Sequence, residues 1–114
     1  MSGSVFKIPA TGIGLITASM TVPAGDVYRI LAVSCNFNIA PTTSENFTIT
    51  INDAIGPAYD LLLYTLDPSA AATTDILWQP NAELMLVGGD ALDVAYANTD
   101  GRTWGIVFYV KAVP

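Results

Sequence analysis

Turn-forming sequences recur about every 8–14 residues along this chain, and short segments with alternating side chains lie between them. This spacing is typical of an all-β sandwich or barrel, and no convincing amphipathic helix appears. Strands are predicted roughly over residues 4–8, 14–22, 27–39, 46–52, 60–66, 74–79, 83–87, 91–97 and 103–112. We therefore expect a single antiparallel β-sandwich of eight or nine short strands, with a jelly roll favoured and an immunoglobulin-like sandwich second.

The turns themselves have explicit chemistry. Asp100-Gly101 is a hairpin signal between the last two predicted strands. Residues 24–26 and 88–90 both place a glycine and an aspartate directly before a strand, which suits tight corners in a two-sheet fold. A length of 114 residues is natural for one domain, so residues 1–114 are expected to form it, with residues 1–12 left open as an extended N-terminal arm.

Alternation within the predicted strands separates a core face from a wet face. The sole cysteine, Cys35, falls on a core face, so we expect it to be buried and chemically inert, and no intrachain disulfide is possible. The predicted core consists of Leu31, Val33, Phe37, Phe47, Ile49, Ile51, Leu92, Val94, Trp104, Ile106 and Phe108.

Two predicted strands are apolar on both faces. In residues 103–110, Trp104, Ile106 and Phe108 share one face, while Val107 and Tyr109 lie on the other. Residues 60–66 are similar, with Leu62, Tyr64 and Leu66 on one of two apolar faces. A partner could cover these second faces. Alternatively, the N-terminal segment folds over the last strand, loops cover both strands, or Val107 and Tyr109 are singly exposed.

The partner alternative predicts a homo-oligomer, because aromatic and apolar side chains are enriched where subunits meet. Lys111, near the end of the last strand, would mark the rim of such a contact. The candidate interface consists of Leu62, Tyr64, Leu66, Val107 and Tyr109.

Charge is scarce and mostly negative. Charged residues make up 12% of the chain against 52% hydrophobic residues, which favours buried interfaces over a free monomer. The net charge is −6, with ten acids against Lys7, Arg29, Arg102 and Lys111. Four scattered cations argue against binding nucleic acid or an anionic membrane. No apolar run approaches the roughly 20 residues that span a bilayer.

No catalytic, cofactor or metal site is predicted. The chain has no histidine, which removes Ser-His-Asp and Cys-His catalysis and histidine-based metal sites. Four oxygen-bearing side chains, Asp90, Asp93, Asn98 and Asp100, lie close in sequence, and hard cations favour such ligands. They lack EF-hand spacing, so we interpret them as solvated turn and surface residues.

A carbohydrate platform built from exposed aromatic rings is the competing function class. Trp78 and Trp104 each align with apolar residues on their strands and are expected to serve the core. The aromatic residues free for surface contact would then be Tyr28, Tyr59, Tyr64 and Tyr109.

Residues 22–38 (VPAGDVYRILAVSCNFN) and 88–110 (GGDALDVAYANTDGRTWGIVFYV) resemble small β-sandwich virion proteins of tailed phages, of the head decoration or cement type. The resemblance is one of length, absent histidine, low charge, and Gly-Asp sequences before strands. It spans most of the chain without a diagnostic motif.

The resemblance implies a non-enzymatic structural protein of the virion, present in the host cytoplasm during assembly, that braces a major capsid protein. It also implies a homo-oligomer, with a trimer favoured. The alternative is a carbohydrate-binding or receptor-binding module of a phage tail.

Overall fold

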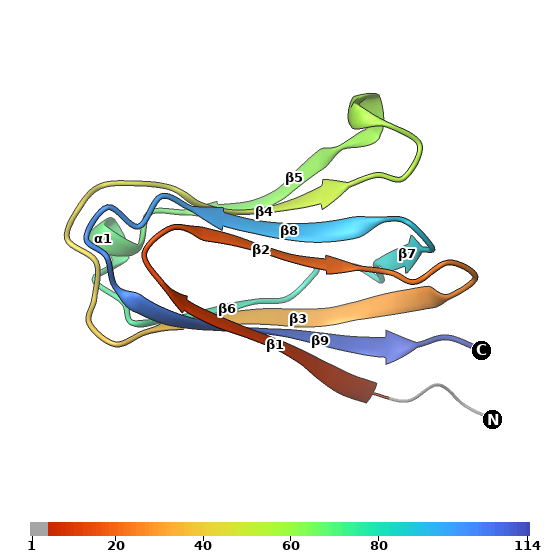
Figure 1. Cartoon of the computed structure of the whole chain (residues 1–114), viewed down its shortest axis with the longest axis horizontal. Helices are drawn as coiled ribbons and strands as arrows, with labels where there is room; N and C mark the ends of the chain where they lie inside the picture. The colour runs from red at the N-terminus through yellow and green to blue at the C-terminus, as the bar shows by residue number, and fades with distance from the viewer. Residues whose placement is uncertain (1–4) are drawn as a thin grey trace.

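Two antiparallel β-sheets pack face to face in the computed structural model, which describes residues 5–114 (Figure 1). The five-stranded sheet has the order β1 (Val5–Ile13), β9 (Thr103–Ala112), β3 (Val27–Phe37) and β6 (Asp75–Trp78), with β7 (Met85–Val87) also paired to β3. The four-stranded sheet has the order β2 (Ile16–Thr21), β8 (Ala91–Tyr96), β4 (Phe47–Asn52) and β5 (Leu61–Leu66). The predicted all-β sandwich is therefore confirmed.

Two short helices interrupt segments that the sequence predicts as turns or loops. The 3₁₀-helix η1 (Pro57–Tyr59) lies between β4 and β5, and α1 (Pro68–Ala71) lies between β5 and β6. Asp67 caps α1, because its side chain accepts hydrogen bonds from the backbone N–H groups of Ser69 and Ala70. Pro68 then occupies the first helical turn, where its missing N–H costs nothing.

A single hydrophobic cluster fills the space between the sheets. Every predicted core residue except Leu31 is buried. The prediction for Leu31 is wrong because the β3–β9 register shifts between Ile30 and Ala32. This bulge adds one residue to β3, so Ile30 and Val33 both face the core and Leu31 turns away.

Cys35 is buried, as predicted, with 1% of its surface exposed. Burial removes water from around the sulfur and raises the pKa of the thiol to about 12.

The N-terminal segment extends the five-stranded sheet sideways. β1 pairs with β9 along its whole length, from Val5 opposite Lys111 to Ile13 opposite Thr103. Residues 5–12 of the segment left open as an arm are thus an edge strand beside β9 and do not cross its outer face. Residues 1–4 of that segment, and residue 4 of the first predicted strand, lie outside the described residues.

Candidate interaction surface

The outer face of the five-stranded sheet carries apolar side chains in rows across its strands. One row contains Pro9 on β1, Val107 on β9, Ser34 on β3 and Leu77 on β6, since these residues lie opposite one another in register. Tyr109 occupies the centre of the next row. Leu77, on the edge strand β6, is 65% exposed, whereas Val107 and Tyr109 in the middle of the face are partly exposed.

Three of the four cationic side chains gather on this same face. Lys7 lies opposite Tyr109, and Lys111 lies opposite both Val5 and Arg29. Alternation gives the outward orientation of Arg29, because Tyr28 and Ile30 are buried, and that of the two lysines, because the residues on either side of each pack in or against the core. Among the described residues, one ion pair is formed, between Arg29 and Glu83 at 3.7 Å, which leaves Lys7 and Lys111 unpaired. The outer face of the five-stranded sheet is therefore apolar and cationic along β1 and β9, while Asp75 projects from the same face on the edge strand β6 and Glu83 neutralises Arg29.

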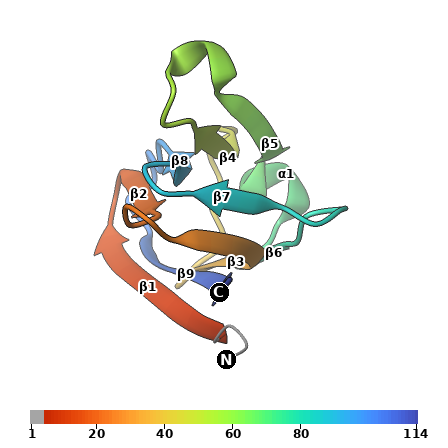
Figure 2. The same cartoon turned by 90° about the vertical axis from the view of Figure 1, so that its right-hand side faces the viewer.

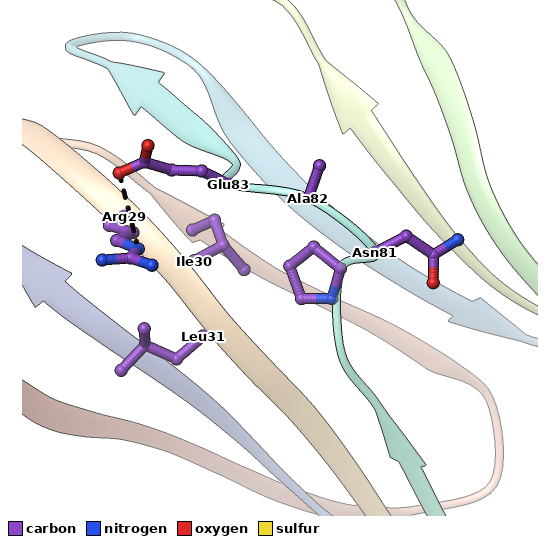
Figure 3. A pocket seen from close by; sticks show the side chains of 7 residues that line it. Arg29, Ile30, Leu31, Asn81, Ala82 and Glu83 are labelled. Carbon is purple, nitrogen blue, oxygen red and sulfur yellow. Dashed lines mark ion pairs between the residues drawn. The ribbon is translucent and has the colours of Figure 1, made fainter.

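An open hollow of about 280 Å³ adjoins Arg29 at the edge where β6 ends and β7 begins. Figure 3 shows the segment 80–83 passing beside β3, with the Arg29–Glu83 ion pair across the hollow. Leu31 lines it because the β3 bulge turns this side chain out of the core. The N–H of Ile30 donates to the carbonyl of Leu84 at 2.9 Å, which fixes the segment to the strand.

A second exposed apolar region is the β4–β5 hairpin, residues 53–62, which stands off the sandwich beyond the four-stranded sheet (Figures 1 and 2). Its members include large hydrophobic side chains exposed by more than half: Ile55, Tyr59, Leu61 and Leu62. Asp53 and Asp60 supply two negative charges, and this hairpin contains no lysine or arginine. It is apolar and anionic.

Internal hydrogen bonds hold the hairpin in shape. The Asp60 carboxylate accepts from the N–H of Asp53 at 2.9 Å, and the Asp53 carboxylate accepts from the N–H of Ile55 at 2.8 Å. The N–H of Ala54 donates to the buried Asp90 carboxylate at 2.9 Å. The apolar tip is thus presented on a fixed backbone.

The outer face of the four-stranded sheet is different in character. Thr17, Ser19 and Thr21 project outward from β2, and the hydroxyl of Ser19 donates to Asp93 on β8 at 2.6 Å. Thr48 and Thr50 on β4 continue this polar surface. It carries neither an aromatic ring nor a large hydrophobic side chain on β2, β4 or β8, so it is the face typical of contact with water.

The four residues weighed as cation ligands do not form one site. Asp90 lies before β8, while Asn98 and Asp100 follow it, so that strand separates them by about 20 Å. The prediction that all four are solvated is wrong for Asp90 and Asn98, which are 7% and 2% exposed. Asp90 accepts from the N–H groups of Ala54 and Val87, and Asn98 bonds Gly14 and Arg102.

At the opposite end from the hairpin, carboxylates join neighbouring loops. Asp100 accepts from the N–H groups of Thr42 and Thr43 and from the Thr43 hydroxyl, and these bonds lower its pKa to about 2. Asp67 accepts from the hydroxyls of Ser44 and Ser69, and its pKa is also lowered to about 2. Within residues 5–114 no three His, Cys, Asp or Glu residues are grouped to hold a metal ion.

The structure does not bring the five candidate interface residues into one patch: three lie on two separate surfaces, and two pack against the core. Val107 and Tyr109 lie on the outer face of the five-stranded sheet, as expected. Leu62 is 55% exposed at the base of the hairpin. Tyr64 and Leu66 instead pack, partly buried, against the core, since they lie opposite the buried Ile49 and Phe47.

The aromatic side chains lie only partly where the sequence predicts them, in the core or on the surface. Trp104 is buried, and Trp78 packs partly buried against the core. Tyr59 is exposed, as predicted, but Tyr28 is not free for surface contact. It packs edge-to-face on Phe6 with ring centroids 5.4 Å apart. Sequence reasoning missed the apolar tip at Ile55, although an isoleucine inside a Gly/Pro-rich turn is a readable signal of exposed apolar surface.

No helix among residues 5–114 has the length and apolar character needed to cross a membrane.

Comparison with known proteins finds similarity in fold to solved structures. No family model matches the chain, and no curated protein matches it. A chain in the structure described as the acidic stable capsid of Helicobacter pylori bacteriophage KHP30 aligns with a TM-score of 0.51 and 14% identity, over 96% of this chain and 94% of that one. An arabinose-bound α-L-arabinofuranosidase aligns with a TM-score of 0.40 and 13% identity, over 94% of this chain and 22% of that chain. The phage capsid chain therefore shares the sandwich fold of this protein across nearly the full length of both.

Proposed function

We propose that this chain is a non-enzymatic structural protein of a phage virion, which decorates or cements the capsid through protein–protein contacts and uses no cofactor. Its partners would be other copies of itself, with a trimer favoured, and a major capsid protein. Residues 1–114 would act as one domain in the virion, and in the host cytoplasm during assembly.

The single observation that carries this proposal is the fold match to a chain of a phage capsid over nearly the whole of both chains. The surface supports it. Exposed large hydrophobic residues gather on the hairpin and on the outer face of the five-stranded sheet, where protein partners can cover them. Nucleic acid is disfavoured, because the cations present are few and the net charge is −6.

We also infer that the sandwich is a jelly roll. The antiparallel pairs β1·β9, β2·β8, β3·β6 and β4·β5 nest inside one another along the chain. Successive pairs alternate between the two sheets. A long nested hairpin rolled in this way gives two interlocked Greek keys, which is the definition of the jelly roll.

The tail carbohydrate-binding or receptor-binding alternative has less support. Sugar platforms need exposed rings on one surface. Tyr59 is exposed on the hairpin, whereas Trp104 and Tyr96 are buried and the four-stranded sheet presents threonine, serine and alanine outward.

Cryo-electron microscopy of the purified phage that encodes this chain tests the proposal. We expect density for the sandwich on the outside of the head, in contact with the major capsid protein. Density at a tail tip, or absence of the chain from purified particles, would overturn it. Glycan-array screening adds a second readout, because saturable sugar binding that is lost in Tyr59→Ala would favour the tail alternative.

A further inference from the structure

The two exposed apolar surfaces of this chain have opposite charge. The outer face of the five-stranded sheet carries Lys7 and Lys111 without ion-pair partners among the described residues. The hairpin, residues 53–62, carries Asp53 and Asp60 and no cation. Each surface is thus an apolar centre with charges that the other would neutralise.

We propose that the hairpin of one copy docks on the outer face of the five-stranded sheet of a second copy. This inference rests on the homo-oligomer of the proposed function and specifies how its copies meet. Ile55, Tyr59 and Leu62 would contact the surface around Val107 and Tyr109, while Asp53 and Asp60 approach Lys7 and Lys111.

A second copy is the occupant that the charges favour. Two chains of net charge −6 repel each other overall, so a stable contact must oppose one of the few cationic surfaces to an acidic one. Lys7 and Lys111 form that cationic surface, since Arg29 beside them is paired with Glu83, and the hairpin combines acidic residues with exposed large hydrophobic side chains. Contact between two like faces would bring the cations together and is disfavoured.

The shape of the hairpin is compatible with docking at a low entropic cost. The hydrogen bonds that Asp60, Asp53 and Asp90 accept from residues 53–55 fix its backbone before binding. The hairpin projects from the side of the sandwich away from β9, as both views show (Figures 1 and 2). One copy can therefore donate its hairpin and receive another at the same time.

Such a contact is heterologous, since different surfaces meet, and it has a consequence for symmetry. Head-to-tail contacts close into a ring when the rotation between copies allows it and otherwise give filaments. The trimer favoured by the resemblance corresponds to closure after three copies.

Sedimentation velocity across the micromolar range, with pairs of broken surfaces, tests the docking. Val107→Glu with Tyr109→Glu disrupts the sheet face, and Ile55→Ser with Leu62→Ser disrupts the hairpin. Each double variant alone should lose self-association by at least about tenfold, as expected for apolar contacts at an interface centre. An equal mixture should form a dimer and nothing larger, because one intact hairpin then meets one intact sheet face.

A matched control changes two other exposed hydrophobic residues. Leu15→Ser with Ile39→Ser alters side chains that are 66% and 56% exposed outside both surfaces, and it should keep the native mass. Circular dichroism checks that each variant is folded. If the glutamate variant unfolds, Lys7→Glu with Lys111→Glu replaces it, since both lysines project outward from the sheet.

The overturning results are distinct. A native chain that stays monomeric throughout the micromolar range refutes the docking, as does a double variant of either surface that keeps the native mass. A native oligomer whose two variants stay monomeric when mixed also refutes it, because an intact hairpin and an intact sheet face would then fail to bind each other. Failure of the proposed function would appear elsewhere, as absence of the chain from the head of purified particles.

Discussion

Asn98 fixes the turn between β8 and β9 in a conformation that few residues tolerate. Its φ is 51°, in the left-handed region, and its side chain is buried. The Nδ2 group donates to the carbonyls of Gly14 and Arg102 at 2.7 and 2.8 Å, and Oδ1 accepts from the N–H of Arg102 at 3.1 Å. One side chain thus joins the β8–β9 turn to the β1–β2 turn.

Replacing Asn98 by alanine is expected to lower the free energy of unfolding by about 2–4 kcal/mol. Part of this loss comes from buried groups left without partners, and part from the left-handed backbone. Asn98→Gly should be less damaging, because glycine removes only the hydrogen-bond contribution. Urea denaturation of both variants measures the difference. Equal stability of the alanine variant and the native chain would contradict the assigned role.

At the scale of single residues, the sequence predicts which side chains lie in turns better than it predicts which of them are buried. Asp90 and Asn98 are correctly located in turns, but their burial depends on backbone groups brought close by pairing of distant strands, such as Gly14 for Asn98. Tyr28 is likewise buried because β1 carries Phe6 against it. No local pattern around residue 28, 90 or 98 contains that information.

Two turns pack back to back where β2 leads into β3 and β7 leads into β8. The N–H of Gly89 donates to the carbonyl of Val22 at 2.9 Å, and the N–H of Val22 donates to the carbonyl of Asp90 at 2.9 Å. A Cβ on Gly88 would lie 2.9 Å from both the nitrogen of Gly25 and the carbonyl oxygen of Pro23. Those are backbone atoms, which cannot move aside as a side chain can.

Gly88→Ala is therefore expected to destabilise the fold by about 1–3 kcal/mol, the usual cost of overpacking. Gly105→Ala in β9 is the matched control, because its Cβ would meet nothing within 4 Å. The control should stay within about 1 kcal/mol of the native chain or gain slightly. Thermal unfolding of both variants checks this, and an unaffected Gly88→Ala protein would show that the two turns separate readily.

The Asp100 carboxylate makes the loops at the α1 end sensitive to acid. Its pKa is about 2 in the folded chain, below its ordinary value of 3.8, because the N–H groups and hydroxyl of Thr42 and Thr43 stabilise the charged form. A lowered folded pKa contributes stability that is fully present above pH of about 4 and is lost as the pH falls toward about 2. Asp67 acts in the same direction over the same window.

Asp100→Asn should therefore be less stable than the native chain at neutral pH and should lose less of its melting temperature between about pH 4 and pH 2. Asp26→Asn is the control, since this exposed carboxylate accepts no hydrogen bond among those found in residues 5–114. It should keep the native acid response. A native-like slope in Asp100→Asn would remove Asp100 as a source of that response.

The strands themselves are largely predictable, since alternation and turn residues locate each one to within a few residues apart from β1, which extends to Ile13. The β3 bulge is not predictable in this way. Residues 27–37 alternate plausibly in a regular strand, and only pairing with β9 shows that Leu31 is the extra residue. The sequence alone therefore does not predict that Arg29 and Leu31 point away from the core and line the hollow beside β7.

Over the whole molecule, the fold sorts three of the four cations onto one face. Lys7, Arg29 and Lys111 are far apart in sequence and meet only because β1, β9 and β3 are neighbours in one sheet. The sequence predicts that Val107 and Tyr109 share an outer face, but strand order is needed to add cations to it. Strand order is also needed to show that this face and the acidic hairpin lie on different sheets of the sandwich.

This sorting predicts how salt affects self-association through the docking proposed above. Raising the NaCl concentration from about 0.05 M to about 0.5 M shortens the range of attraction between Lys7 or Lys111 and the hairpin carboxylates, so the dissociation constant should rise severalfold. Lys7→Gln with Lys111→Gln should bind more weakly at low salt and respond little to added salt. Asp93→Asn, on the opposite sheet, should keep the native salt response. Association that strengthens with salt in the native chain would mean that apolar contact alone drives it, and the opposition of cationic face and acidic hairpin would then have to be abandoned.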